Sequence, residues 1–127
     1  MTELTHYIGG KHVKGTSGRF ADVFNPATGE VQHRVPLAST DELADAVEGA
    51  ARVQPEWAAV NPQRRARVMM KFVDLLNRDM DKLAEALSRE HGKTIPDAKG
   101  DVQRGLEVVE YCIGAPQMLK GEFTDSA

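Results

Sequence analysis

A change of hydrophobic period at Ser39 most constrains what this chain of 127 residues can fold into. Before it, apolar and polar side chains alternate, as in "RFADVF" (19–24) and "EVQHRV" (30–35), a pattern typical of half-buried strands. After it, apolar residues recur every three or four positions, as in an amphipathic helix. The sequence therefore predicts an α+β fold, mostly α with N-terminal β-hairpins. We expect a β-hairpin region (1–38) and a helical region (39–127) that together form one partial domain.

Glycine and proline place the turns of two hairpins. Gly9 and Gly10 lie between "THYI" and "KHVK" and supply the positive φ angles that a two-residue hairpin turn needs. In "NPATGE" (25–30) a proline fixes φ and a glycine permits a left-handed residue, so the chain reverses direction again.

Capping signals place the first two helices. Ser39 and Glu42 fit a capping box, in which each side chain takes the backbone N–H of the other residue. A helical stripe of apolar residues then runs to Trp57. Asn61 followed by Pro62 is typical of a helix start, because proline in the first turn loses only an N–H that has no partner there.

The tripeptide Gly92-Lys93-Thr94 also occurs in the phosphate-binding loop GxxxxGK[ST]. The first glycine of such a loop would stand at residue 87, but Leu87 there closes the apolar stripe of the second helix. We therefore interpret Gly92 as the left-handed residue that ends this helix, which bends near residues 77–81. Lys93 would complement the carbonyl end, and Thr94 would cap a third helix.

Composition excludes several classes of partner. The chain has 16 Lys and Arg against 19 Asp and Glu, so its net charge of -3 offers no attractive field to nucleic acid. No apolar run approaches the roughly 20 residues of a membrane span. With no secretory signal and only one cysteine, a reducing interior is favoured, either cytoplasmic or the mitochondrial matrix if the source is eukaryotic.

Cysteine and histidine often act in catalysis, but in this sequence their positions do not favour reactivity. Cys112 lies late in the third helix, away from the helix N-terminus or cation that activates a thiol, so we expect a buried core cysteine. The histidines share no metal-ligand spacing, and they are His6, His12, His33 and His91. The sequence therefore predicts no catalytic residue, no cofactor-binding residue and no metal site in this chain.

One face of the third predicted helix contains a candidate binding residue, Arg104. Gly100, Arg104, Val108, Tyr111 and Ala115 share this face, opposite an apolar stripe. A guanidinium held there presents a planar fork of donors suited to a carboxylate, from a protein partner or from a ligand. The alternative is that Arg104 is solvated or pairs with the carboxylate three residues later in the helix, Glu107.

Taken together, three segments resemble the start of an aldehyde dehydrogenase: "VFNPATGEVQHRVPLAST", "AVEGAARVQPEW" with "RRARVMMKFVDLL", and "LSREHGKTIPDAKGDV". The resemblance covers almost the whole chain but only about the first quarter of a family member. Within the family, "EHGKTIPDAKGDVQRGLEVVEY" and "GAPQMLKGE" are most similar to the CoA-acylating methylmalonate-semialdehyde dehydrogenases.

The resemblance implies an α/β parent enzyme that oxidises an aldehyde with NAD through a cysteine thiolate. In the acylating branch, CoA accepts the acyl group and the malonate-derived substrate is decarboxylated. The family's catalytic cysteine, general-base glutamate and oxyanion-site asparagine match no residue here, nor do its nucleotide-binding elements. Arg104 is similar in position to an arginine that faces the substrate carboxylate.

We therefore expect neither NAD nor CoA to bind this chain alone. Its partners would be the rest of the parent enzyme, which acts on a small-molecule semialdehyde, and further copies of itself. Two alternatives stay open: a stand-alone helical interaction module, and another aldehyde dehydrogenase acting on a different aldehyde. A reading frame that continues into a cysteine-bearing segment would favour the enzyme over the module.

Overall fold

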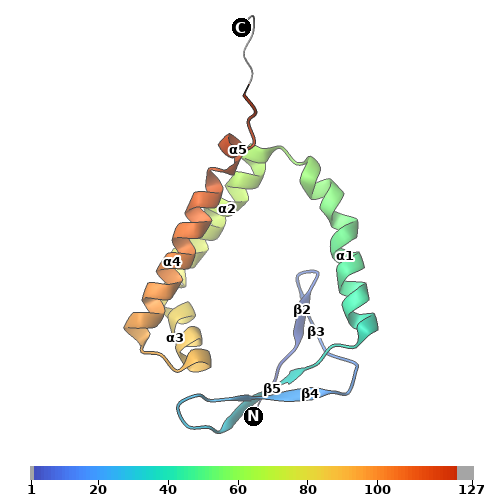
Figure 1. Cartoon of the computed structure of the whole chain (residues 1–127), viewed down its shortest axis with the longest axis vertical. Coiled ribbons are helices and arrows are strands. Elements are labelled where there is room, and N and C mark those ends of the chain that lie inside the picture. The colour runs from blue at the N-terminus through green and yellow to red at the C-terminus, as the bar shows by residue number, and fades with distance from the viewer. Residues whose placement is uncertain (1, 123–127) are drawn as a thin grey trace, which may run out of the picture. The chain divides into compact units, whose positions relative to one another are not determined.

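The computed structural model describes residues 2–122 and divides into two compact units. Unit one comprises residues up to Ala59 together with Arg89–Gly92, and unit two comprises Val60–Ser88 and the residues from Lys93 onward. The predicted fold class is confirmed, since short N-terminal strands are followed by helices in the chain (Figure 1). The last residues of the expected helical region, 123–127, lie outside the described residues.

The strands of unit one are β1 (Thr2–Glu3), β2 (His6–Ile8), β3 (Lys11–Val13), β4 (Phe20–Phe24) and β5 (Val31–Pro36). Both hairpins are present, because β2 pairs antiparallel with β3 and β4 pairs antiparallel with β5. Gly9 and Gly10 form the first turn with φ angles of 59° and 75°. The strand β1 also pairs parallel with β5, which no sequence pattern indicated.

The helices are α1 (Thr40–Ala59), α2 (Pro62–Arg78), α3 (Met80–His91), α4 (Ile95–Ile113) and α5 (Ala115–Met118). The bend predicted near residues 77–81 is a break between α2 and α3. Asp79 lies at this break, where its carboxylate pairs with Arg78 at 2.5 Å and with Lys82 at 3.1 Å. These pairs, with the Arg78 hydrogen bond contributing most, lower the pKa of Asp79 to about 2.

The predicted capping box begins α1 and also holds a loop of unit one. The Glu42 carboxylate accepts from the Ser39 N–H at 2.8 Å, while the Glu42 N–H donates to the Ser39 hydroxyl at 3.1 Å. The same carboxylate accepts from the N–H and hydroxyl of Thr16, at 2.6 and 2.9 Å. These donors favour the charged form, and the Ser39 N–H contributes most in lowering the pKa of Glu42 to about 2.

Gly92 ends α3 as predicted, with a left-handed φ of 82°. A Cβ at this position would come within 3.0 Å of Pro26 in the loop between β4 and β5. In the same part of unit one, the Gln32 side chain donates to the Arg89 carbonyl at 3.4 Å. The tripeptide around Gly92 is therefore a helix stop that docks on the second hairpin.

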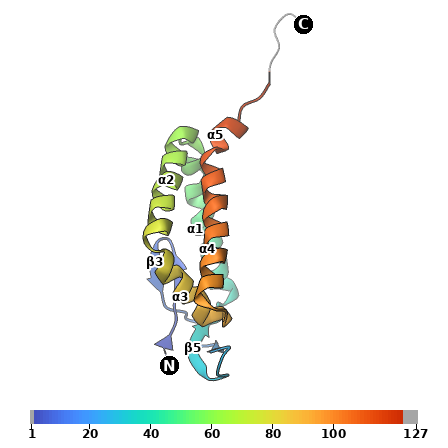
Figure 2. The same ribbon diagram turned by 90° about the vertical axis from the view of Figure 1, so that its left-hand side faces the viewer.

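The two long helices of unit two, α2 and α4, pack side by side, as Figures 1 and 2 both show. The apolar stripe of α4 is buried at Leu106, whose side chain is only 3% exposed. The buried hydrophobic side chains of the described chain are few and mostly small, namely Ala66, Ala84, Ala98 and Leu106. By contrast, the predicted stripe of α1 is open to solvent, with Leu43 61% and Val53 62% exposed. None of the described helices is long and apolar enough to cross a membrane.

The Glu42 hydrogen bonds predict how its carboxyl group titrates. A folded-state pKa below the ordinary value of 4.5 means that the stabilisation is present above pH 4.5 and is lost as pH falls toward about 2. NMR titration of the Glu42 carboxyl carbon should therefore give a midpoint near 2. Thr16→Val should raise this midpoint only partly, because it removes the Thr16 hydroxyl while the N–H groups of Ser39 and Thr16 both remain. An ordinary midpoint in the unmodified chain would contradict the capping geometry.

The close approach at Gly92 predicts a large effect of an added methyl group. Gly92→Ala should lower the free energy of unfolding by about 1–2 kcal/mol for the left-handed backbone alone, and by more because of the contact with Pro26. Gly29→Ala is the matched control, since Gly29 has a φ of 74° but no atom near its added Cβ. Urea unfolding followed by far-UV circular dichroism would measure both. An equal loss for the two variants would mean that Gly92 does not dock on Pro26.

Candidate functional site

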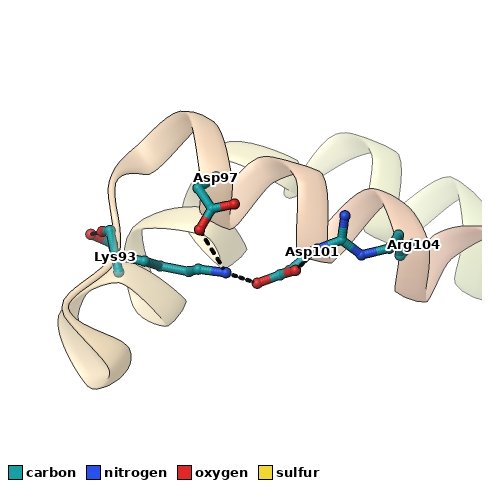
Figure 3. Close-up of polar contacts among 5 residues, drawn as sticks. Lys93, Asp97, Asp101 and Arg104 are labelled. Atoms are coloured by element: carbon teal, nitrogen blue, oxygen red, sulfur yellow. Dashed lines mark hydrogen bonds and ion pairs between the residues drawn. The ribbon is translucent and has the colours of Figure 1, made fainter.

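Four charged side chains form a row at the start of α4, and we call them the α4 ion-pair row: Lys93, Asp97, Asp101 and Arg104. The Lys93 ammonium pairs with Asp97 at 2.9 Å and also with Asp101. Asp101 in turn pairs with the Arg104 guanidinium. Figure 3 shows Asp101 between the two cations, with its oxygens directed toward them.

Lys93 is the less exposed cation of this row. Its side chain is 15% exposed, and its backbone carbonyl accepts from the Ser88 hydroxyl at 2.6 Å. The sequence predicts that Lys93 complements the carbonyl end of α3, but its ammonium pairs with the carboxylates of Asp97 and Asp101 in α4. Direct ion pairs with two carboxylates outweigh the partial charge of a helix end, which explains the difference.

Arg104 lies on the outward face of α4, as the helical spacing predicts. Its side chain is 68% exposed, and on the same face Tyr111 is 70% and Val108 62% exposed. Of the two alternatives for Arg104, the solvent-exposed side chain is observed, whereas its described ion pair is not with Glu107. Arg104 instead pairs with Asp101, one turn earlier, while the Glu107 carboxylate accepts from Gln103 at 3.4 Å.

Thr94 occupies the N-cap position of α4 with an extended backbone, as expected. Its side chain makes no capping hydrogen bond, so the predicted hydroxyl cap is wrong. Asp97 in the first turn supplies negative charge near the same helix end, which is favourable for the helix dipole.

Cys112 is exposed, so the expectation of a buried core cysteine was wrong. The reason is helical phase. Leu106 marks the buried side of α4, and Ile113 lies seven residues later on nearly the same side. Cys112 is six residues after Leu106, which turns it about 120° away from that side.

The described residues offer no metal site, since no three His, Cys, Asp or Glu side chains among them gather closely enough to hold an ion. A pocket of about 190 Å³ in unit one is lined by His6, Ile8, Val13, Glu42, Asp45 and Ala46. This is smaller than the roughly 300 Å³ or more of typical ligand pockets. Its two carboxylates would also repel the phosphates of NAD or CoA, so this pocket fits neither cofactor.

Comparison with known proteins establishes the family. The model of the aldehyde dehydrogenase family matches residues 12–127. The chain belongs to this family.

Two individual relatives within this family are similar to nearly the whole chain. The chain is 44% identical to a malonate-semialdehyde dehydrogenase of Pseudomonas aeruginosa, covering 98% of this chain and 25% of that protein. It is 45% identical to the acylating mitochondrial methylmalonate-semialdehyde dehydrogenase of Arabidopsis thaliana, covering 94% and 20%. The chain thus spans about a quarter or less of the length of these relatives.

Two solved structures with similar names also match nearly the whole chain in sequence and in fold. One is a crystal structure from Sinorhizobium meliloti, assigned as a methylmalonate-semialdehyde dehydrogenase and complexed with NAD. It is 66% identical with a TM-score of 0.93, covering 98% of this chain and 26% of that one. Another methylmalonate-semialdehyde dehydrogenase, from Oceanimonas doudoroffii, is 44% identical with a TM-score of 0.92, covering 96% and 25%.

The role of Asp101 was missed from the sequence, although a signal was present. Lys93, Asp97, Asp101 and Arg104 are spaced by four, four and three residues, which places them along one side of a helix and its N-terminal extension. Opposite charges at that spacing predict a continuous row of ion pairs.

Proposed function

We propose that this chain is part of a CoA-acylating methylmalonate- or malonate-semialdehyde dehydrogenase. In this reaction NAD oxidises the semialdehyde, CoA takes the acyl group as a thioester, and the substrate carboxylate leaves as carbon dioxide. The observation that carries the proposal is the similarity over nearly the whole chain to relatives that bear these names in bacteria and a plant. NAD in the Sinorhizobium meliloti structure supports NAD as the oxidant.

Within that enzyme, we propose that Arg104 binds the carboxylate of the semialdehyde. A guanidinium recognises a carboxylate through parallel N–H donors, so it suits a substrate that carries this group beside its aldehyde. Two features of the site support the role: Arg104 is 68% exposed, and its contact with Asp101 uses Nη2. The face around it, with Val108 and Tyr111, would lie against the substrate or its access path.

The isolated chain is expected to be inactive. We expect the catalytic cysteine, the general-base glutamate and the nucleotide-binding elements to lie in other parts of the enzyme, as the family resemblance implies. Cys112 matches none of those positions. We propose that the enzyme is located in the cytoplasm, or in the mitochondrial matrix if the source is a eukaryote. The second location is supported by the Arabidopsis thaliana relative, which is described as mitochondrial.

A second candidate function is a stand-alone helical interaction module, which the open apolar stripe of α1 favours. Leu43, Val47, Val53 and Trp57 on this stripe are between 48% and 62% exposed. Such a surface commonly marks a contact with another protein surface. The same stripe fits the enzyme proposal equally well if the remaining parts of the enzyme cover it. A reading frame with a stop codon directly after Ala127 would favour the module.

The Arg104 proposal predicts a selective kinetic defect in the full-length enzyme. Arg104→Ala should lower kcat/KM for malonate semialdehyde about 10- to 100-fold, the usual range for losing a hydrogen bond to a charged group. The loss should appear mainly in KM, and propanal, which has no carboxylate, should be nearly unaffected.

Arg67→Ala is the control, because Arg67 is an exposed arginine on α2. Steady-state kinetics on both substrates would measure the effect. An equal loss for malonate semialdehyde and propanal would leave Arg104 as part of the scaffold.

The exposed stripe of α1 predicts that the isolated chain self-associates, because water is excluded when two such stripes meet. Leu43→Lys combined with Val47→Lys should reduce the mass measured by light scattering at high concentration. Glu48→Lys changes the net charge by the same amount on the polar side of α1, and it should leave the association unchanged. A monomeric unmodified chain at high concentration would refute the prediction.

A further inference from the structure

Asp101 holds two cations at once, one with each oxygen of its carboxylate. Oδ2 accepts from the Lys93 ammonium, and Oδ1 accepts from Nη2 of Arg104. Figure 3 shows the carboxylate between them. The orientation of the Arg104 guanidinium therefore depends on a residue that also has a second charged partner.

The Lys93 end of this arrangement is the anchored one. The Lys93 side chain is 15% exposed and its backbone carbonyl is held by Ser88, whereas Arg104 is 68% exposed. Asp101 itself is 31% exposed. A single exposed ion pair orders a long side chain weakly, but several charges in one network with a fixed member order it better.

We infer that Asp101 is a positioning residue for Arg104, and that Lys93 fixes Asp101 while offsetting its negative charge. This inference rests on the proposed role of Arg104 in binding the substrate carboxylate. Holding the guanidinium before substrate arrives reduces the side-chain freedom that binding must remove. Without Lys93, the Asp101 charge would repel the incoming carboxylate. With Lys93 and Arg104 set against Asp97 and Asp101, the row has no net charge, so the guanidinium can meet an anion without net repulsion from the row.

A competing role for Asp101 is that of a counter-ion that the substrate must displace. The contact geometry favours positioning instead. Among the described contacts of Arg104, Asp101 engages one hydrogen of Nη2. The second Nη2 hydrogen, with Nη1 or Nε beside it, leaves a pair of parallel donors for a second carboxylate. The two roles predict opposite signs when the Asp101 charge is removed, so they can be separated by experiment.

The test compares variants of the full-length enzyme. Asp101→Asn should raise KM for malonate semialdehyde about 5-fold, the upper range for loss of an ordering ion pair at an exposed site. The values of kcat, and of KM for propanal, should stay unchanged. Asp81→Asn is the matched control, since Asp81 pairs with Lys99 of α4 at 2.6 Å. The thermal midpoint of each variant should be measured as well, because Asp101 is 31% exposed with two cationic partners whereas Asp81 is 77% exposed with one.

Lys93→Met supplies a second measurement if Asp101→Asn destabilises the protein. It leaves the Asp101–Arg104 pair in place but removes the anchor and the offsetting charge, so the same selective rise in KM is expected. A fall in KM for Asp101→Asn would identify a competing counter-ion and overturn the inference. So would an unchanged KM, or an equal rise with propanal.

The failure of this inference is distinguishable from failure of the proposed function. If Arg104→Ala is selective for malonate semialdehyde while Asp101→Asn is not, only the positioning role fails. If Arg104→Ala itself shows no selectivity, the proposed carboxylate site fails, and the role of Asp101 fails with it.

Discussion

Scarcity of buried apolar surface is the constraint on which the rest of this structure depends. In the described residues the buried hydrophobic side chains are three alanines and Leu106, all in unit two. Full burial of these side chains and of Pro36 in unit one, with the other apolar side chains only partly buried, contributes less than a complete core of a domain of this size. The large side chains that would normally fill a core, such as Trp57 and Phe72, are 48% and 44% exposed. These faces have the pattern of a core whose other half is supplied by another surface.

Because burial is scarce, local polar contacts define much of the observed structure. Glu42 joins the start of α1 to the loop at Thr16, and Gly92 allows α3 to end against Pro26. Asp101 joins Lys93, two residues before α4, to Arg104 in the third turn of that helix. Each contact is made by residues close to an element boundary, where backbone donors or charged side chains need partners. They determine where elements begin and end more than how tightly the helices pack.

The difference between local contacts at element boundaries and packing between elements explains which features could be predicted from the sequence. The hairpin turns, the capping box at Ser39, the start of α2 and the stop at Gly92 depend on residues within a few positions, and all are confirmed. The pairing of β1 with β5 was missed because a two-residue strand carries no period. The partner of Arg104 was missed because carboxylates stand three residues before and three residues after it. Lys93 holds the earlier carboxylate in place, which the local spacing around Arg104 alone does not reveal.

The functional proposal likewise rests on two different kinds of support. Membership of the aldehyde dehydrogenase family follows from a match over most of the chain. The proposed carboxylate site at Arg104 rests on the family resemblance and on chemistry, because an exposed guanidinium held by a carboxylate is suited to a second anion. The sequence could place Arg104 on the correct face, since that depends on helical phase. It could not show which neighbour orients it.

Hydrogen–deuterium exchange on residues 40–59 tests the central claim most directly, since α1 carries the most exposed apolar stripe. The same peptides would be compared in the full-length enzyme and in the 127-residue chain at low concentration. The account predicts strong protection in the full-length enzyme and weak protection in the isolated chain, because the covering surface is missing there. Equal and strong protection in both would show that this segment is stable by itself, and would contradict the account.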